Sequence, residues 1–257
     1  MAAVKNHGAK VILYWLNESR SHRILWLLEE LKVPYEVKVF KRSKQALAPP
    51  EMKEIHPIGK APIMAITREG RKDLVMVESG LIIEYLVDHW GPQLKPRRYP
   101  EGQEGQAGDE TESYMRDRWF MHASEGSLMP LLVFKILTAA MRSKNVPFLV
   151  RPITSLIAGK IESTALHPRI HEQLEYIEGL AKTAPSGGPY LCGNSLTGSD
   201  FMMSYPLQGA QQSGLITKER YPCLSGWIAN IEALPSYHAA VEKTKEIDGK
   251  FGLFPEM

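Results

Sequence analysis

A continuous apolar run near the start of the chain restricts the fold more than any other feature. Val11–Leu16 reads VILYWL, as expected for a strand that is buried on both faces. The polar turn Asn17–Ser21 follows, and apolar side chains then recur at helical spacing over Ile24–Leu31, before Pro34. Tyr35–Phe40 alternates apolar and polar residues, which predicts a second strand. Because a strand–helix–strand crossover gives parallel pairing, the chain is expected to begin as an α/β unit.

Four further elements are expected to complete this unit. A short helix is predicted after the Pro49-Pro50 pair, where proline suits the first helical turn. Pro62–Thr67 and Leu74–Val77 read as a hairpin, and Ser79–His89 reads as a helix. Together these segments predict a small mixed sheet with helices packed on it.

The composition changes after this unit. Proline and glycine dominate the next stretch, and little apolar content returns before Tyr114, as in a domain linker. From Glu110 onward the periodicity is helical, and helices are expected at residues 110–140, 147–159, 167–181, 199–213, 223–234 and 236–245. The predicted fold class is an α/β N-terminal domain plus an all-α C-terminal domain: residues 9–92, a linker at 93–108, and residues 109–257.

Composition excludes several classes of protein. Of the 257 residues, 44% are hydrophobic and 23% are charged, as in ordinary globular proteins. The 31 basic and 29 acidic residues leave a net charge of +2, so no strong overall field favours nucleic acid or an anionic membrane. The two cysteines, Cys192 and Cys223, are too few for a disulfide framework and suit a reducing compartment.

Neither a membrane-spanning helix nor a signal peptide is expected from the apolar segments of the sequence. The longest apolar runs, residues 24–28 and 128–134, are shorter than the roughly 18 residues of a spanning helix. Residues 1–10 lack the apolar core of a signal peptide. A cytosolic protein without a transmembrane segment is therefore the default expectation.

The turn between the first strand and the first helix is a candidate anion site. Free backbone N–H groups and the helix dipole favour a negative charge there. The Ser19 hydroxyl can donate a hydrogen bond to a thiolate, which lowers a thiol pKa from about 8.5. From spacing alone, a helix-capping role for Ser19 or Asn17 is the more common alternative.

Two later turns have the same ambiguity. In the segment HPIGKAP, Pro62 comes directly before a strand, where a cis bond could turn a backbone edge toward a ligand, although most such bonds are trans. Glu78 and Ser79 join a strand to a helix, so they suit either a clamp for a charged group or a helix cap.

Two other motifs are interpreted as structural. Thr197–Asp200 has an acid three residues after a threonine, which predicts a capping box. His167 and His171 lie four residues apart, but no third ligand accompanies them, so no metal site is predicted.

The order of these motifs resembles that of the cytosolic glutathione transferases. A Ser-containing first turn is followed by HPIGKAP, then VESG before a helix, and later YLCGNSLTGSD in a helical domain. The resemblance covers residues 11–245. Ala48–Lys53 and His122–Pro130 are similar to a fungal group that includes an endoplasmic-reticulum-associated yeast transferase.

The resemblance implies a thioredoxin-like domain that binds glutathione and a helical domain that binds an electrophile. By this motif match, Ala61 before a cis Pro62 meets the cysteinyl backbone of glutathione, and Lys60 meets the glycyl carboxylate. Glu78 and Ser79 hold the γ-glutamyl end. The resemblance thus implies glutathione as the co-substrate and no bound metal ion.

The resemblance leaves the residue that activates the thiol open. Ser19 precedes Arg23 by four, as in serine-type transferases, but the NESRS context departs from the usual Ser-Pro-x-x-Arg. The competitors are Asn17, Arg20 and Ser21, whereas Tyr14 is expected too deep in the strand. Because the turn contains no cysteine, a cysteine-type transferase is not expected.

The electrophile pocket is expected along the long helix after Glu110. Met115, Trp119 and His122 share one helical face there, although ordinary core packing explains Met115 and Trp119 equally well. The expected activity is conjugation of glutathione to small hydrophobic electrophiles, as in detoxification. The alternatives are a glutathione-dependent peroxidase, a pathway-specific C–S bond-forming enzyme, and a non-catalytic regulatory or ligand-binding protein on the same fold.

Partners and location follow from the same resemblance. Members of the family are usually homodimers, so a homodimer that binds glutathione and a small electrophile is implied. No nucleic acid is expected, and the implied location is cytoplasmic, with peripheral association with the endoplasmic reticulum left open.

Overall fold

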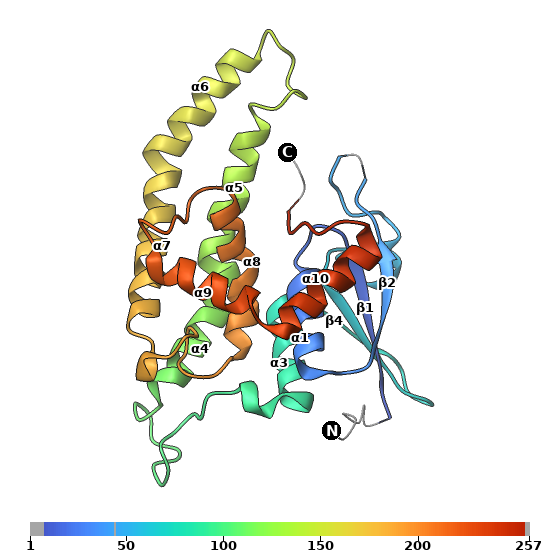
Figure 1. Cartoon of the computed structure of the whole chain (residues 1–257). Coiled ribbons are helices and arrows are strands. Elements are labelled where there is room, and N and C mark those ends of the chain that lie inside the picture. The colour runs from blue at the N-terminus through green and yellow to red at the C-terminus, as the bar shows by residue number, and fades with distance from the viewer. Residues whose placement is uncertain (1–7, 44, 255–257) are drawn as a thin grey trace.

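The computed structural model describes residues 8–43 and 45–254, and its N-terminal part is a four-stranded mixed sheet with helices (Figure 1). The strands lie in the order β2-β1-β3-β4, with β1 parallel to β2 and antiparallel to β3. The elements are β1 (Lys10–Leu16), α1 (Ser21–Leu31), β2 (Tyr35–Phe40), α2 (Met52–Ile55), β3 (Ile63–Thr67), β4 (Leu74–Val77) and α3 (Ser79–Trp90). The predicted α/β unit is confirmed.

The central strand β1 is buried on both faces, as its apolar run predicts. Val11, Leu13 and Trp15 face the large core that α1 and α3 share with the helical domain. Ile12 and Tyr14 face a smaller cluster on the other side of the sheet. The strand therefore fixes the positions of the turns at its ends.

The C-terminal part is entirely helical among the described residues, apart from one isolated β-bridge between Tyr190 and Gly193. Its helices are α4 (Glu112–Ala123), α5 (Met129–Ala140), α6 (Arg151–Ile161), α7 (His167–Lys182), α8 (Gly198–Gln212), α9 (Pro222–Glu232) and α10 (Pro235–Asp248). The 3₁₀ turns Pro92–Leu94 and Pro185–Gly187 connect neighbouring elements.

Two π-helical turns join successive helices without a break. Ser124–Leu128 joins α4 to α5, and Glu162–Leu166 joins α6 to α7. The expectation of separate helices at 147–159 and 167–181 is therefore wrong, because the chain stays helical from Arg151 to Lys182. Each π-helical turn precedes a proline, Pro130 or Pro168, whose missing N–H and bulky ring do not fit a regular α-helical turn.

The predicted capping box is confirmed at the start of α8. The Asp200 carboxylate accepts hydrogen bonds from the Thr197 and Leu191 backbone N–H groups, at 2.8 and 3.1 Å, and from Trp227 Nε1 at 2.9 Å. Asp200 is fully buried, and burial raises its pKa to about 6. This one carboxylate ties α9 to the start of α8.

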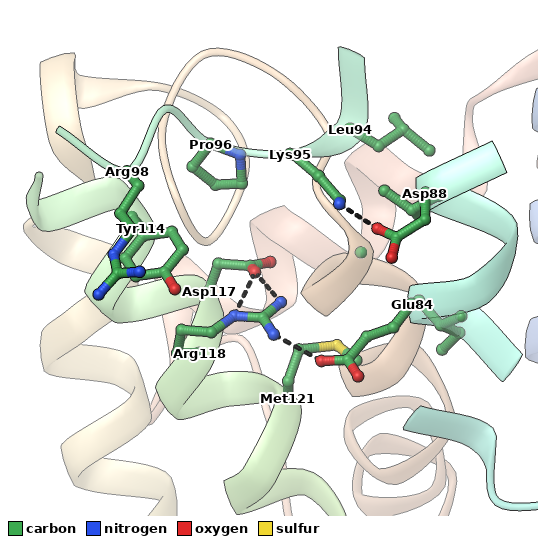
Figure 2. Close-up of a pocket in the computed structure, with 13 residues that line it drawn as sticks. Glu84, Asp88, Leu94, Lys95, Pro96, Arg98, Tyr114, Asp117, Arg118 and Met121 are labelled. Atoms are coloured by element: carbon green, nitrogen blue, oxygen red, sulfur yellow. Dashed lines mark hydrogen bonds and ion pairs between the residues drawn. The ribbon is translucent and has the colours of Figure 1, made fainter. Parts of the chain in front are cut away.

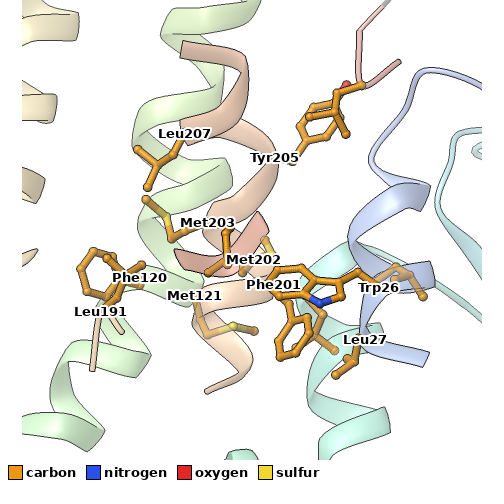
Figure 3. Packing of buried hydrophobic residues seen from close by; sticks show 14 of the residues in the cluster. Trp26, Leu27, Phe120, Met121, Leu191, Phe201, Met202, Met203, Tyr205 and Leu207 are labelled. Atoms are coloured by element: carbon orange, nitrogen blue, oxygen red, sulfur yellow. The ribbon is translucent and has the colours of Figure 1, made fainter. Parts of the chain in front are cut away.

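The two parts share a continuous core (Figure 3). Trp26 on α1 packs on Phe201 of α8 with ring centroids 4.2 Å apart, and Met202 and Met121 surround them. Helix α10 also lies along α1. The thioredoxin-like sheet thus presents one helix-covered face to the helical domain.

The run from Glu112 to Ala140 meets the criteria of length and composition for a helix that could cross a membrane. Its most apolar 18-residue stretch has a mean hydropathy of 1.2 and is 33% buried. Core helices of globular proteins meet the same criteria, so the finding describes the helix and does not by itself place it in a membrane.

Candidate active site

The strand register brings the three predicted turns to one end of the sheet. Tyr14 on β1 lies opposite Ile63 on β3, and Ile63 lies opposite Val77 on β4. The turn after β1, the segment before β3 and the turn after β4 therefore share this end. The sequence motifs predicted these turns singly, and the sheet topology places them together.

Ser19 lies in the first turn and is 4% exposed. Its hydroxyl donates to the Leu16 carbonyl at 2.7 Å, and its Oγ accepts from the Ser21 backbone N–H at 3.1 Å. The Ser21 hydroxyl lies 3.0 Å from the same Oγ. Ser19 Oγ thus accepts a hydrogen bond from the first backbone N–H of α1, and the Ser19 hydroxyl proton is directed to the Leu16 carbonyl at the end of β1.

Asn17 begins this turn and is held by an arginine from the loop after β2. Its Oδ1 accepts from the Arg42 backbone N–H at 2.7 Å, and its carbonyl accepts from Arg42 Nε at 3.0 Å. Arg42 Nη2 also donates to the Glu18 carbonyl at 3.2 Å. Glu18 itself has a φ of 50°, so this arginine stabilises a backbone conformation that few residues adopt.

Two arginines of α1 and its N-cap share one carboxylate of the helical domain. Arg20 Nε and Arg23 Nη1 each donate to Glu125 Oε1 at 2.9 Å. Burial opposes the charge on Arg20, but the hydrogen bond and charge of Glu125 outweigh it and raise the Arg20 pKa. Burial lowers the pKa of Arg23, which is fully buried, to about 10.

Three arginines gather around the Tyr205 ring in this cluster. Arg20 and Arg23 lie over the Tyr205 ring, 5.7 and 5.2 Å from its centroid, and Arg42 is close enough to act on the same phenol. Glu125 is shared by Arg20 and Arg23, while Glu78 acts on Arg20 and Glu18 acts on Arg42 without a side-chain hydrogen bond. Arg23 Nε and Nη2 are buried with no partner among the described residues. The end of the sheet is therefore suited to an anion.

The second and third turns complete the candidate site. The Ala61–Pro62 bond is cis, as the resemblance implies, with Lys60 exposed beside it. Glu78 has a φ of 72°, the left-handed region that a residue with a Cβ rarely adopts. Ser79 follows it at the start of α3, is 3% exposed, and its Oγ has no hydrogen-bond partner among the described residues. A buried hydroxyl without a partner is costly unless a ligand supplies one.

The residues predicted to line the electrophile pocket lie on a different face of α4. Met115 and His122 are exposed, and Trp119 packs edge-on against Tyr176 of α7, with centroids 5.1 Å apart. The face that meets the N-terminal part instead carries Glu125. The structure therefore groups Met115, Trp119 and His122 with one another but not with the first turn.

A cavity of about 400 Å³ lies between α3, the segment after it and α4 (Figure 2). Arg118 crosses it, donating to Glu84 of α3 at 2.5 Å and to Asp117 at 2.6 Å. Lys95 pairs with Asp88 at its rim. None of the predicted glutathione residues lines this cavity, and of its ion pairs Arg118–Glu84 crosses the contact between the two parts.

The two cysteine thiols of the chain, Cys192 and Cys223, lie outside the candidate site. Burial raises the pKa of Cys192 to about 12, and burial together with Glu178 raises that of Cys223. Neither thiol is therefore a thiolate near neutral pH. Among the described residues no group of His, Cys, Asp and Glu could hold a metal ion, and His171 Nδ1 lies 2.7 Å from the Tyr221 hydroxyl.

Several residues at the site escaped the sequence reasoning. Arg42 and Tyr205 come from segments with no motif, and Lys250 in the C-terminal tail pairs with Glu18 at 3.3 Å. Glu125 lies within His122–Pro130, the segment that is similar to the fungal group, but helical periodicity cannot show that its side chain contacts α1. Its neighbours His122, Ser124 and Ser127 are polar as well, so the local sequence does not distinguish Glu125.

Comparison with known proteins agrees with this architecture. A sequence model described as "Glutathione S-transferase, N-terminal domain" matches residues 19–89, and one described as "Glutathione S-transferase, C-terminal domain" matches residues 129–235. Glutathione S-transferase 1 of Saccharomyces cerevisiae is 30% identical over 240 residues, covering 93% of this chain and 97% of that protein. Glutathione S-transferase 3 of Schizosaccharomyces pombe is 33% identical over 236 residues, covering 92% and 88%.

Solved structures show the same fold. A glutathione S-transferase from Actinobacillus pleuropneumoniae superposes with a TM-score of 0.64 and 26% identity, covering 95% of this chain and 94% of that one. A glutathione transferase from Phanerochaete chrysosporium, in complex with oxidized glutathione, has a TM-score of 0.65 and 20% identity, covering 95% and 100%.

A thioredoxin-like sheet followed by an all-helical domain defines the class of two-domain glutathione transferases that the family models and solved structures represent. The chain belongs to the glutathione S-transferase family, and it is an enzyme of that class.

Proposed function

We propose that this chain conjugates the thiolate of glutathione to small hydrophobic electrophiles. The sulfur attacks an electrophilic carbon, a C–S bond forms, and the leaving group departs with its electron pair while the thiol proton passes to solvent. The observation that carries the proposal is the buried Ser79 hydroxyl, which has no hydrogen-bond partner among the described residues, beside Glu78 with its positive φ. Relatives of this fold bind glutathione, and this corner supplies the polar contacts that such a peptide needs.

The end of the sheet supplies contacts for each part of glutathione. In this proposal Ser79 and Glu78 hold the charged γ-glutamyl end, with the free N–H groups of α3 behind them. The backbone of Ala61, before Pro62, pairs with the cysteinyl residue. The exposed Lys60 meets the glycyl carboxylate, since its ammonium is free to turn toward an anion.

The first turn activates the sulfur. Ser19 donates to the thiolate after releasing the Leu16 carbonyl, and the start of α1 and the Arg20–Arg23 pair add positive potential. Arg20 is the strongest competitor for the direct contact, because its guanidinium is about one-third exposed. Asn17 and Ser21 are weaker competitors, since Arg42 holds the first and the second is buried.

The remaining parts of the proposal rest on the family. Met115, Trp119 and His122 stay a prediction for the electrophile pocket, to be tested by alanine variants against several electrophiles. Homodimerisation is proposed and is checked by light scattering. A cytoplasmic location, with or without contact to the endoplasmic reticulum, is checked by cell fractionation.

Two variants test the site with glutathione and 1-chloro-2,4-dinitrobenzene. Ser79→Ala should raise the glutathione KM about 10-fold with kcat nearly unchanged, because one hydrogen bond to a charged ligand is worth roughly 1.5–3 kcal/mol. Ser19→Ala should lower kcat about 10-fold and raise the kinetic pKa of bound glutathione while leaving its affinity nearly intact.

Conservative and remote variants control this experiment. Ser79→Thr keeps the hydroxyl and should restore most of the affinity, and Ser163→Ala on the far helices should change nothing. If the wild type neither binds glutathione-agarose nor turns over any electrophile, the chain is a non-catalytic member. If only hydroperoxides are consumed, the peroxidase alternative replaces conjugation.

A further inference from the structure

The hairpin formed by α5 and α6 projects beyond the rest of the helical domain (Figure 1). Its tip, residues 141–150, carries Phe148 and Leu149 with 74% and 75% of their surface exposed. The exposed apolar side chains continue down both helices from this tip: Val133, Phe134, Leu137, Val150, Ile153, Leu156 and Ile157. An exposed apolar surface of this extent marks an interaction site.

The charge of the same segment is one-sided. From Gly126 to Ile161 the sequence contains no aspartate or glutamate, but it contains Lys135, Arg142, Lys144, Arg151 and Lys160. Arg142 pairs with Glu162 just below the segment, at 2.7 Å. The other four basic residues form no ion pair with any acid in the part of the chain that the structure describes. Lys144 and Lys160 are exposed.

Apolar side chains flanked by unpaired basic groups match the chemistry of an anionic lipid surface. Phenylalanine, leucine and isoleucine enter the boundary between headgroups and acyl chains, and lysine and arginine bind the phosphates and carboxylates above them. We propose that the α5–α6 tip docks the protein on an anionic membrane surface. Because only a few apolar side chains enter the boundary layer and the rest of the attraction is electrostatic, this contact is peripheral and reversible.

A second copy of the chain is the main alternative occupant of this surface. A two-fold contact between two such tips would bring Lys144 and Arg151 of each copy toward those of the other, with no acid in the segment to separate them. An anionic bilayer meets both the apolar and the basic side chains. The charge pattern therefore favours the membrane.

Co-sedimentation of the full-length protein with vesicles tests the proposal. The wild type should sediment with vesicles of phosphatidylcholine and phosphatidylserine, and much less with phosphatidylcholine alone. Added salt should release it, since the electrostatic part is screened. Conjugation of a water-soluble electrophile is measured in the same samples, so loss of docking and loss of activity are read separately.

Two tip variants separate the apolar from the basic contribution. Phe148→Ser with Leu149→Ser should weaken partitioning about 100-fold, taking one order of magnitude per side chain. Lys144→Glu should weaken it about 25-fold, at roughly 5-fold per unit of charge. The matched control combines Leu74→Thr and Lys72→Glu on the hairpin of the sheet, where both residues are exposed, and should bind like the wild type.

Each of three outcomes would overturn the proposal. The wild type could stay in the supernatant with anionic vesicles, or the tip variants could sediment as well as the wild type. Alternatively, light scattering could show that the Phe148 and Leu149 changes convert a dimer to a monomer without altering vesicle binding, which would assign the tip to an interface between copies. Unchanged conjugation in these variants keeps the proposed enzymatic function separate from all three.

Discussion

His22 places a titratable ring where no water reaches it. It is fully buried on α1 between Tyr237 and Phe251, with ring centroids 5.4 and 5.1 Å away, and its Nε2 has no partner among the described residues. Burial, reinforced by the charge of Arg23, lowers its pKa to about 3. The native state therefore holds His22 neutral throughout the pH range in which the unfolded chain protonates it.

The stability of the protein should consequently fall in mild acid. Since the native pKa lies below the unfolded value of 6.5, the unfolded state binds the extra proton, and stability is lost as the pH falls from 6.5 toward 3. At about pH 5 this amounts to roughly 2 kcal/mol. The free energy of unfolding of His22→Phe and of the wild type is measured in urea at about pH 7.5 and pH 5. Relative to the wild type, the variant should be more stable by that amount at pH 5 than at pH 7.5. An equal pH dependence in both proteins would mean that His22 is not the responsible group.

The residues of the candidate site fall into two groups: those that a short sequence motif marks, and those that reach the site only through long-range contacts. Ser19, Pro62 and Ser79 could be predicted, because each stands where a strand meets a turn and a motif of a few residues marks it. Arg42 and Glu125 could not, because they reach the first turn across 25 and 105 residues of sequence. Only the packing of one part on the other creates those contacts.

Helices α6 and α7 show that secondary-structure boundaries, too, can depend on long-range contacts that the local sequence does not reveal. Every strand and most helices follow from periodicity, and Tyr35–Phe40 and Leu74–Val77 match their predicted bounds. The π-helical turn Glu162–Leu166 does not, because proline at 168 is typical of both a helix start and a kinked helix interior. The choice is made by tertiary contacts that hold the turn.

Glu162 supplies those contacts. Its carboxylate accepts from the Thr138 hydroxyl of α5 at 2.5 Å and from Arg142 Nη1 at 2.7 Å. These partners lower its pKa to about 2, Arg142 contributing most. The π-helical turn between α6 and α7 is thus tied to α5 through one ionised side chain.

Glu162→Gln should destabilise the protein by about 2 kcal/mol at neutral pH. Because the native pKa is depressed, the stabilisation is complete above the unfolded value of 4.5 and is lost as the pH falls toward 2. The difference between variant and wild type should therefore shrink across that interval in thermal or urea unfolding. Glu175→Gln on α7, which breaks an exposed pair with Arg220, should cost under about 0.5 kcal/mol. A Glu162 effect no larger than this control would refute the assignment.

The whole molecule depends on the contact between the sheet and the helices. Nine of the eleven residues of α1 are buried, since the sheet covers one face of this helix while α8 and α10 cover the others. Trp26 is at the centre of this contact, packed against Phe201 with the rings tilted by 43°, and its Nε1 donates to Ser236 of α10 at 3.1 Å. The change in periodicity along the sequence predicted two domains. Periodicity does not reveal that the buried residues of the two parts pack together in one shared core.

A chain with such a shared core should unfold as one unit. Residues 8–94 alone would expose the α1 surface that Phe201 and α10 cover, so we expect this fragment to be unfolded or aggregated. In the full chain, urea transitions followed by far-ultraviolet circular dichroism and by tryptophan fluorescence should coincide. Trp26→Ala should shift both by the same amount, about 4 kcal/mol, because the cavity it leaves belongs to both parts. Separate transitions, or a well-dispersed NMR spectrum from the isolated fragment, would show instead that the N-terminal part is stable by itself and that the helices only complete its site.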